Sequence, residues 1–192
     1  HQETGMAIAS RFDEATILFA DIVDFTGLAA EVPPTQLVQM LDDIFSAFDA
    51  IADRLGLEKI KTIGDAYMVV GGLPIPQLDH ADQVMAMAIA MLRVVKTFYR
   101  QDGNPFCLRI GINTGPVVAG VIGTKKFSYD LWGDAVNIAS RLESHGLINR
   151  IQVSKTTYQC LKHLYPFEER GCIDIKGRGP MKTYLYSGDL DR

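Results

Sequence analysis

The sequence has little cysteine, no long apolar run and no excess of positive charge, and each absence excludes a class of protein. Its 192 residues include three cysteines without a CxxC or Cys/His metal spacing, which argues against a disulfide framework or a zinc site and favours a reducing compartment. No apolar run approaches the ~18 residues of a membrane span. The formal net charge is −4, so we expect no nucleic-acid partner.

The remaining composition is typical of a folded α/β or α+β chain. Hydrophobic residues make up 47% and charged residues 22%, which excludes a disordered protein. The length suits one domain that buries a substantial core. The chain begins at His1 and shows no signal peptide. We therefore expect an excised domain at residues 14–192, preceded by the remnant of an upstream linker at residues 1–13.

The most informative stretch is an apolar run that ends in acids. Residues 15–20 are rich in β-branched and aromatic side chains and predict a strand, and Asp21 and Asp24 follow at its far end. Asp65 lies at the tip of a predicted hairpin between residues 57–63 and 66–71. Two carboxylates at neighbouring strand ends suit Mg²⁺, which takes one or two protein carboxylates plus phosphate oxygens. Ordinary turn formation by Asp and Gly is the alternative, and the third acid favours the metal site.

The rest of the chain predicts two helices and several further strands. Apolar side chains at three- and four-residue steps predict a helix over residues 35–55, ended by Gly56, and a second helix over residues 81–95. We expect His80, in the first turn of the second helix, to lie on the surface. Residues 107–115 and 117–123 read as a second hairpin. The element order is then the βαββαβ pattern of a ferredoxin-like α+β sheet with both helices on one face.

The C-terminal part adds helices, strands and three polar groups suited to phosphate. Residues 134–143 predict a helix on which Asn137 and Arg141, four positions apart, share one face. A strand at residues 151–154, a short helix near residues 155–163 and strands around residues 167–175 and 182–186 follow. Lys176 lies in the basic, glycine-rich turn between the last two strands, which suits a phosphate group.

Five linked motifs resemble the catalytic domain of class III nucleotidyl cyclases, the group that includes adenylyl and guanylyl cyclases. The resemblance runs from about residue 14 to about residue 187, in the order that the family shows. The motifs, in chain order, are FADIVDFT, KTIGDAYM, RIGINTG, YDLWGD and VNIASR.

This resemblance implies a metal site and a base-reading pair. Asp21 and Asp65 match the two aspartates that bind two divalent cations, Mg²⁺ or Mn²⁺, and the backbone carbonyl of Ile22 helps to hold the second ion. Lys61 and Asp130 match the pair that reads adenine. An ammonium donor and a carboxylate acceptor complement the N1 acceptor and exocyclic amino donor of adenine, whereas guanine reverses that edge.

The resemblance also assigns the groups that hold the ribose and the phosphates. Asn137 and Arg141 match the residues that position the ribose and stabilise the reacting phosphate. A positive charge there meets the negative charge that develops when the 3′-hydroxyl attacks the α-phosphate and pyrophosphate leaves. The groups that match the triphosphate-binding part of the family site are Arg109, Lys176, Phe25 and Thr26.

The expected function is therefore adenylyl cyclase, converting ATP to 3′,5′-cyclic AMP and pyrophosphate. The resemblance implies a head-to-tail homodimer in which each site takes its metal aspartates from one chain and its base-reading residues from the other. We expect a cytoplasmic domain with an upstream regulatory domain, and membrane tethering of the whole protein stays open.

Two alternative functions also stay open at this point. A guanylyl cyclase is one, because residues 64–74 read like the guanylyl branch, although guanylyl members typically place Glu and Cys where Lys61 and Asp130 stand. A catalytically silent nucleotide-binding dimerisation module is the other. Against it, neither the metal acids nor the Asn137 and Arg141 pair is missing.

Overall fold

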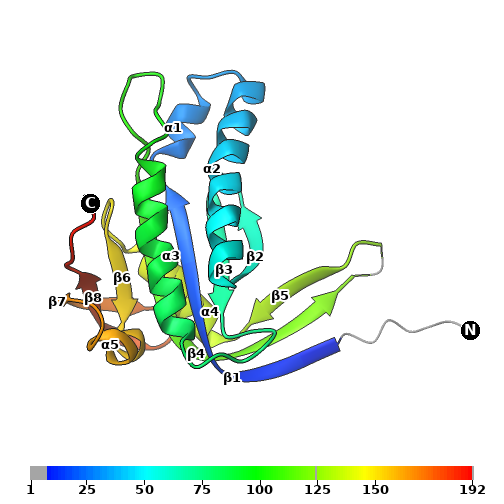
Figure 1. Ribbon diagram of the computed structural model, residues 1–192, viewed down its shortest axis with the longest axis vertical. Coiled ribbons are helices and arrows are strands. Elements are labelled where there is room, and N and C mark those ends of the chain that lie inside the picture. Colours follow the sequence, from blue (N-terminus) through cyan, green and yellow to red (C-terminus); the bar gives the residue numbers. More distant parts are fainter. Residues whose placement is uncertain (1–7, 124, 192) are drawn as a thin grey trace, which may run out of the picture.

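The computed structural model describes residues 8–123 and 125–191, which form one eight-stranded sheet with helices on both faces (Figure 1). The order along the sheet is β2-β3-β1-β4-β6-β8-β7, and β5 pairs with β4 off this path. None of the helices in this part of the chain combines the length and apolarity that a membrane crossing requires. The elements are β1 (Ile8–Ile22), α1 (Phe25–Ala29), α2 (Pro34–Leu55), β2 (Glu58–Ile63), β3 (Ala66–Gly71), α3 (His80–Val95), β4 (Leu108–Ile122), β5 (Ser128–Trp132), α4 (Asp134–Ser144), β6 (Ile151–Ser154), α5 (Lys155–Leu161), β7 (Phe167–Ile175) and β8 (Gly179–Tyr186).

The central strand β1 carries one core on each of its faces. It lies between β3 and β4 and runs antiparallel to both. Leu18, Ala20 and Ile22 belong to the core under α2 and α3, whereas Ile17 and Phe19 belong to the core under α4. This alternation is the two-residue period of a strand. The predicted α+β class and the βαββαβ order, with α2 and α3 on one face, are confirmed.

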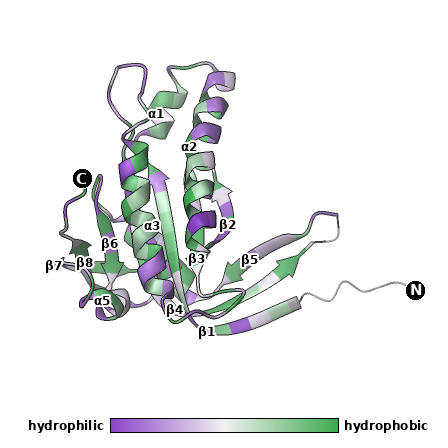
Figure 2. Ribbon diagram, in the orientation of Figure 1, coloured by the Kyte–Doolittle hydropathy of each residue, from purple (hydrophilic) through white to green (hydrophobic). Residues whose placement is uncertain are grey.

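The two long helices form where the apolar periodicity predicts them. In α2, Pro34 occupies the first turn, and Gly56 ends the helix in the left-handed conformation with φ of 69°. Ile44, Phe48 and Ile51 form its buried stripe, and Figure 2 shows the resulting alternation of apolar and polar bands along α2. Burial of such a stripe, rather than helix propensity alone, stabilises a helix in a folded domain.

The predicted second hairpin is wrong, because β4 continues through Pro116 as a single strand. The register between β1 and β4 shifts at this point: Gly115 pairs with Ala15, and Val117 pairs with Phe12. Pro116 therefore lies opposite a β-bulge, where its missing N–H interrupts no regular ladder. The second half of β4, the start of β1 and β5 form a three-stranded arm, residues 8–12, 117–122 and 128–132, which projects beyond the helices (Figure 1).

The structure also moves the expected N-terminal boundary. Strand β1 begins at Ile8, and residues 8–12, expected as part of a linker, pair with β4 in the sheet. The earlier part of the expected linker lies outside the described residues. The strands and the short helix predicted for the C-terminal part are confirmed to within a few residues as β6, α5, β7 and β8.

His80 is buried, so the prediction that it lies on the surface is wrong. It is 6% exposed, and its Nδ1 lies 2.7 Å from the Thr16 hydroxyl oxygen. Two glycines at the end of β3 make this approach possible. A Cβ added at Gly71 would lie 3.0 Å from the His80 carbonyl oxygen, and one added at Gly72 would lie 3.3 Å from the His80 Cβ.

Candidate active site

Asp21 and Asp65 lie side by side at one end of the sheet. Asp21 is near the end of β1, Asp65 is in the turn between β2 and β3, and the backbone N–H of Ile22 donates to the Asp65 carbonyl oxygen at 3.3 Å. Burial, the neighbouring Asp65 carboxylate and the nearby Glu143 carboxyl raise the pKa of Asp21 to about 7, while Arg109 acts in the opposite direction. The structure thus brings together the two acids that the sequence pairs as metal ligands.

This acid pair fits a divalent cation. The Asp21 Oδ1 atom is buried and has no hydrogen-bond partner among the residues that the structure describes. An unpartnered buried carboxylate oxygen beside a second carboxylate is a donor set that a hard cation satisfies. Within residues 8–123 and 125–191, no three or more His, Cys, Asp or Glu side chains gather as a metal site. Further ligands would therefore come from water and from the phosphates of a nucleotide.

The Glu143 carboxyl lies close enough to Asp21 and Asp65 to affect their charges, and the sequence reasoning did not include it. Burial raises the pKa of Glu143 to about 7, with Asp65 adding to the rise and Arg109 opposing it. Helix α4 packs closely on β4 here, because a Cβ added at Gly111 would lie 2.2 Å from the Glu143 backbone nitrogen. Helical spacing could have predicted that Glu143 faces inward, because it follows the fully buried Ala139 by four residues and shares its face of the helix.

Lys61 and Asp130 form an ion pair within one chain. The Lys61 Nζ lies 2.8 Å from the Asp130 Oδ2, although β2 and β5 are far apart in sequence. The other carboxylate oxygen of Asp130 accepts a hydrogen bond from the Leu131 backbone N–H at 2.7 Å. The side chains of Lys61 and Asp130 are 40% and 22% exposed, so both are open to a ligand. The structure therefore brings the predicted base-reading pair together, and its role stays a prediction.

Asn137 and Arg141 lie on the exposed side of α4, and Lys176 lies close to Arg141. Asn137 and Arg141 are both exposed on this helix. Arg141 lines an open hollow of about 450 Å³ together with Lys176, from the turn between β7 and β8. Arg141 and Glu143 are two residues apart and so point about 200° apart around the helix. Within one chain, the side of α4 that carries Arg141 therefore faces away from Glu143 and the acids Asp21 and Asp65.

The start of α4 is held by a buried amide. Asn113 of β4 is 4% exposed and donates a hydrogen bond from Nδ2 to the Ala135 carbonyl oxygen at 3.0 Å. Its Oδ1 accepts a hydrogen bond from the Thr156 hydroxyl at 3.2 Å. These contacts fix the first turn of the helix that carries Asn137, which makes Asn113 a positioning residue that the sequence reasoning missed.

The turn after β1 separates the third acid from the other two. Asp24 has φ of 58°, and its carboxylate pairs with the Arg100 guanidinium at 3.3 Å. The adjacent acids at this end of the sheet are therefore Asp21 and Asp65, without Asp24. Phe25 and Thr26 follow in α1, where Phe25 packs partly against the core and Thr26 is exposed. Arg109 is paired in register with Asp21 across the two strands, close to the same acids.

Comparison with known proteins decides the family. Residues 7–188 match the family described as the adenylate and guanylate cyclase catalytic domain. The chain belongs to this family. This cyclase domain is 49% identical over 181 residues to an adenylate cyclase of Mycobacterium tuberculosis (strain ATCC 25618 / H37Rv), covering 94% of this chain and 41% of the relative. It is 44% identical over 185 residues to the guanylate cyclase soluble subunit beta-2 of Rattus norvegicus, covering 95% of this chain and 27% of the relative.

A solved structure confirms the fold of the cyclase domain. The catalytic core of a rhodopsin-guanylyl cyclase with converted specificity, in complex with ATPαS, matches it with a TM-score of 0.90 at 38% identity. The match covers 96% of this chain and 100% of that one. The cyclase domain spans less than half the length of the mycobacterial and rat relatives.

Proposed function

We propose that the cyclase domain is an adenylyl cyclase, which converts ATP to 3′,5′-cyclic AMP and pyrophosphate at sites shared between two chains. The observation that carries the proposal is the 2.8 Å pair of Lys61 and Asp130. Together they offer an ammonium donor to the N1 of adenine and a carboxylate acceptor to its amino group. A site that hydrogen-bonds one purine edge rejects the other purine, because its polar groups are then left unpaired.

The other predicted site residues have roles that follow from their charge. Arg141 donates hydrogen bonds to the α-phosphoryl oxygens, where negative charge develops as the O3′–P bond forms and the bond to pyrophosphate breaks. Lys176, beside Arg141 in the same hollow, and Arg109 neutralise the triphosphate. Asn137 hydrogen-bonds the ribose, and the turn at Phe25 and Thr26 offers backbone N–H groups to the phosphates.

The acid pair supplies the metal site of this proposal. Asp21 and Asp65, together with the Ile22 backbone carbonyl, would hold two divalent cations, Mg²⁺ or Mn²⁺. When bound, these ions would lower the pKa of the 3′-hydroxyl and offset the charge of the leaving pyrophosphate. The buried and unpartnered Oδ1 of Asp21 supports this assignment.

Two features support a head-to-tail homodimer. Asp21 and Asp65 lie on a different side of α4 from Arg141, so a second chain would have to bring the two half-sites together. Large apolar side chains also stay exposed at the end of β2 and on the arm, as they do at protein interfaces. These side chains are Ile63 at the end of β2, and Val118, Ile122, Phe127 and Trp132 on the arm or at its tip.

A parallel assay with ATP and GTP tests the substrate. Purified domain is incubated with each nucleotide under Mg²⁺ and under Mn²⁺, and cyclic product is measured by chromatography. We expect cyclic AMP, with kcat/KM for ATP well above that for GTP. A preference for GTP would contradict the assigned roles of Lys61 and Asp130. Nucleotide binding without product under either metal would instead indicate a silent binding module.

Guanylyl cyclase activity is the second candidate, and the likeness to the rat guanylate cyclase subunit favours it. Against it, Lys61 and Asp130 complement adenine rather than guanine. The same parallel assay separates the two candidates, because each predicts the opposite ratio of kcat/KM values.

A further inference from the structure

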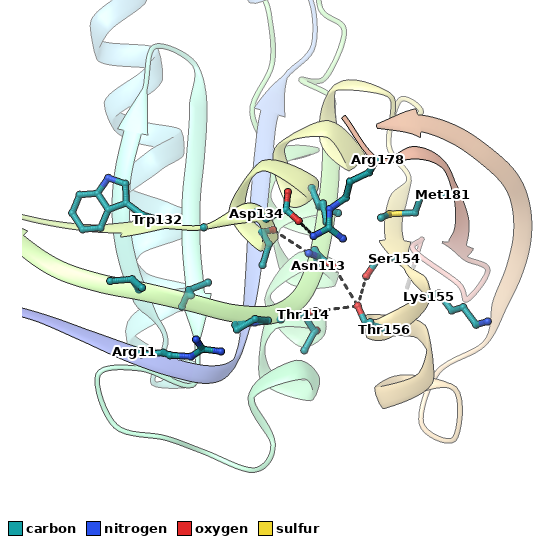
Figure 3. A pocket seen from close by; sticks show the side chains of 17 residues that line it. Arg11, Asn113, Thr114, Trp132, Asp134, Ser154, Lys155, Thr156, Arg178 and Met181 are labelled. Carbon is teal, nitrogen blue, oxygen red and sulfur yellow. Dashed lines mark hydrogen bonds and ion pairs between the residues drawn. The ribbon is translucent and has the colours of Figure 1, made fainter. Parts of the chain in front are cut away.

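A cavity of about 460 Å³ lies beside the first turn of α4 (Figure 3). Its walls come from the middle of β4, the ends of β5 and β6, the start of α5, and β8 with the turn before it. None of the residues assigned to the cyclase reaction lines it. Its volume falls within the range of small-molecule sites, which is roughly 300–1,000 Å³. The cavity is therefore a separate candidate site.

The walls of this cavity are largely apolar. Val117 and Ile138 are buried and form part of its inner surface, and Met181 adds a flexible thioether from β8. Trp132, 39% exposed, lies at the end of the cavity opposite Met181 (Figure 3). An apolar body that lies against the buried side chains of Val117 and Ile138 would lose its contact with water along that wall, which favours binding.

Positive charge gathers at the rim of the same cavity. Arg11, Lys155 and Arg178 all line it, and the only acid among the lining residues is Asp134. Asp134 is already ion-paired with Arg178 (Figure 3), and Arg11 contacts Asp13, which lies outside the cavity. The rim therefore carries more positive than negative charge although the whole chain has a formal net charge of −4.

The polar groups of the inner wall already bond to one another. Asn113, Thr114 and Ser154 are buried, and Thr156 joins them through its hydroxyl group. Because these groups are satisfied within the protein, they do not require polar atoms on a ligand. Polar recognition then falls to the charged rim, and the inner wall accepts an apolar body.

We propose that this cavity binds a small amphipathic anion, that is, an aromatic or alicyclic body of drug-like size with one carboxylate or sulfonate group. The apolar body lies against Val117 and Ile138, and the anionic group lies at the rim, where Lys155 and Arg178 supply positive charge. The positive charge of the rim favours an anionic small molecule over a segment of a second chain, because the whole chain has a formal net charge of −4 and its own charges are mixed. The proposal goes beyond the cyclase reaction, and its test needs no turnover.

A pair of matched probes tests the charge requirement. 8-Anilinonaphthalene-1-sulfonate is an amphipathic anion, and N-phenyl-1-naphthylamine is the same ring system without the sulfonate. Trp132 is the only tryptophan of the chain, so energy transfer from its fluorescence reports a probe bound next to it. We expect saturable binding of the sulfonate with quenching of Trp132, and weaker quenching by the neutral probe.

Charge-reversal variants locate the binding. Lys155→Glu is expected to weaken sulfonate binding by about tenfold, because reversing a neighbouring charge turns an attraction into a repulsion. Lys162→Glu, an equal change just past the end of the same helix and outside the cavity, is the matched control and is expected to leave binding unchanged. Circular dichroism spectra and melting temperatures of both variants confirm that they fold.

Two outcomes would overturn the proposal. Equal effects of the two variants, or quenching that does not depend on the sulfonate, would mean that the probe adheres to the surface without using this cavity. Loss of probe binding as chains dimerise, followed by sedimentation at rising protein concentration, would assign the cavity to a second copy of the chain.

Discussion

Exchanging the purine-reading pair should reverse the substrate preference of the domain. The double variant Lys61→Glu with Asp130→Cys replaces an ammonium donor with a carboxylate acceptor and removes the carboxylate acceptor at the second position. The Lys61 Nζ and the Asp130 Oδ2 lie 2.8 Å apart, so one purine edge would meet both side chains at once. The edge of guanine then fits the variant better than the edge of adenine.

The size of the effect follows from the two hydrogen bonds. A hydrogen bond to a charged group contributes about 1.5–3 kcal/mol, so two reversed contacts amount to about 3–6 kcal/mol. This energy changes the ratio of kcat/KM for GTP over ATP by roughly 10² to 10⁴. The stability should change by less than about 1 kcal/mol, because the pair is partly exposed and such ion pairs contribute little.

The assay measures kcat/KM for both nucleotides and the melting temperature of each variant. The single variant Lys61→Glu faces Asp130 with a second carboxylate, so it should lose activity with ATP without gaining activity with GTP. Lys59→Glu is the matched control: Lys59 lies on the same strand and forms its own 2.9 Å ion pair with Asp49. A double variant that kept the preference of the parent would refute the assignment of these residues to the base.

Three further predictions concern Asp21 and the packing of α4. The pKa of Asp21 is about 7 in the folded chain against an ordinary value of 3.8, so the metal-free domain should lose stability as pH rises from 3.8 to about 7. Asp21→Asn should remove much of that loss of stability, which urea unfolding in EDTA at pH 5 and pH 8 measures; an unchanged dependence of stability on pH would contradict this. The same variant should abolish cyclase activity. Gly111→Ala should lower stability by about 3 kcal/mol, because its Cβ would lie 2.2 Å from the Glu143 nitrogen, and an unchanged melting temperature would argue against this packing. Asn113→Ala should lower the free energy of unfolding by about 1–3 kcal/mol, because it removes the hydrogen bond that holds the start of α4 at Ala135. It should also lower kcat and leave the purine preference unchanged, so a shifted ratio of kcat/KM for ATP over GTP would contradict this role.

Local patterns predicted much of this fold. The stripe that contains Ile44 and Phe48, and the stop at Gly56, depend on residues close together in sequence, so α2 could be predicted nearly to the residue. The two acids at strand ends and their family motifs likewise indicated Asp21 and Asp65 before any coordinates, and the structure places them side by side.

The errors came from contacts between distant segments. Proline usually interrupts a strand. At Pro116 the bulge in the facing strand β1 allows β4 to continue. His80, on α3, is buried because Gly71 and Gly72 at the end of β3 leave room for it. Glu143 lies near Asp21 and Asp65 because α4 packs directly on Gly111. In each case the partner that decides the outcome lies on another element, which no local pattern contains.

The shared site is tested most directly by mixing two inactive chains, one carrying Asp21→Ala and the other Asn137→Ala. In each variant alone, both sites of the dimer are broken. A mixed dimer has one site with both intact halves and one with neither. Random pairing of an equal mixture makes about half of the dimers mixed, so we predict about one quarter of the parent specific activity. A mixture that is no more active than the separate variants, although sedimentation shows mixed dimers, would contradict the shared site.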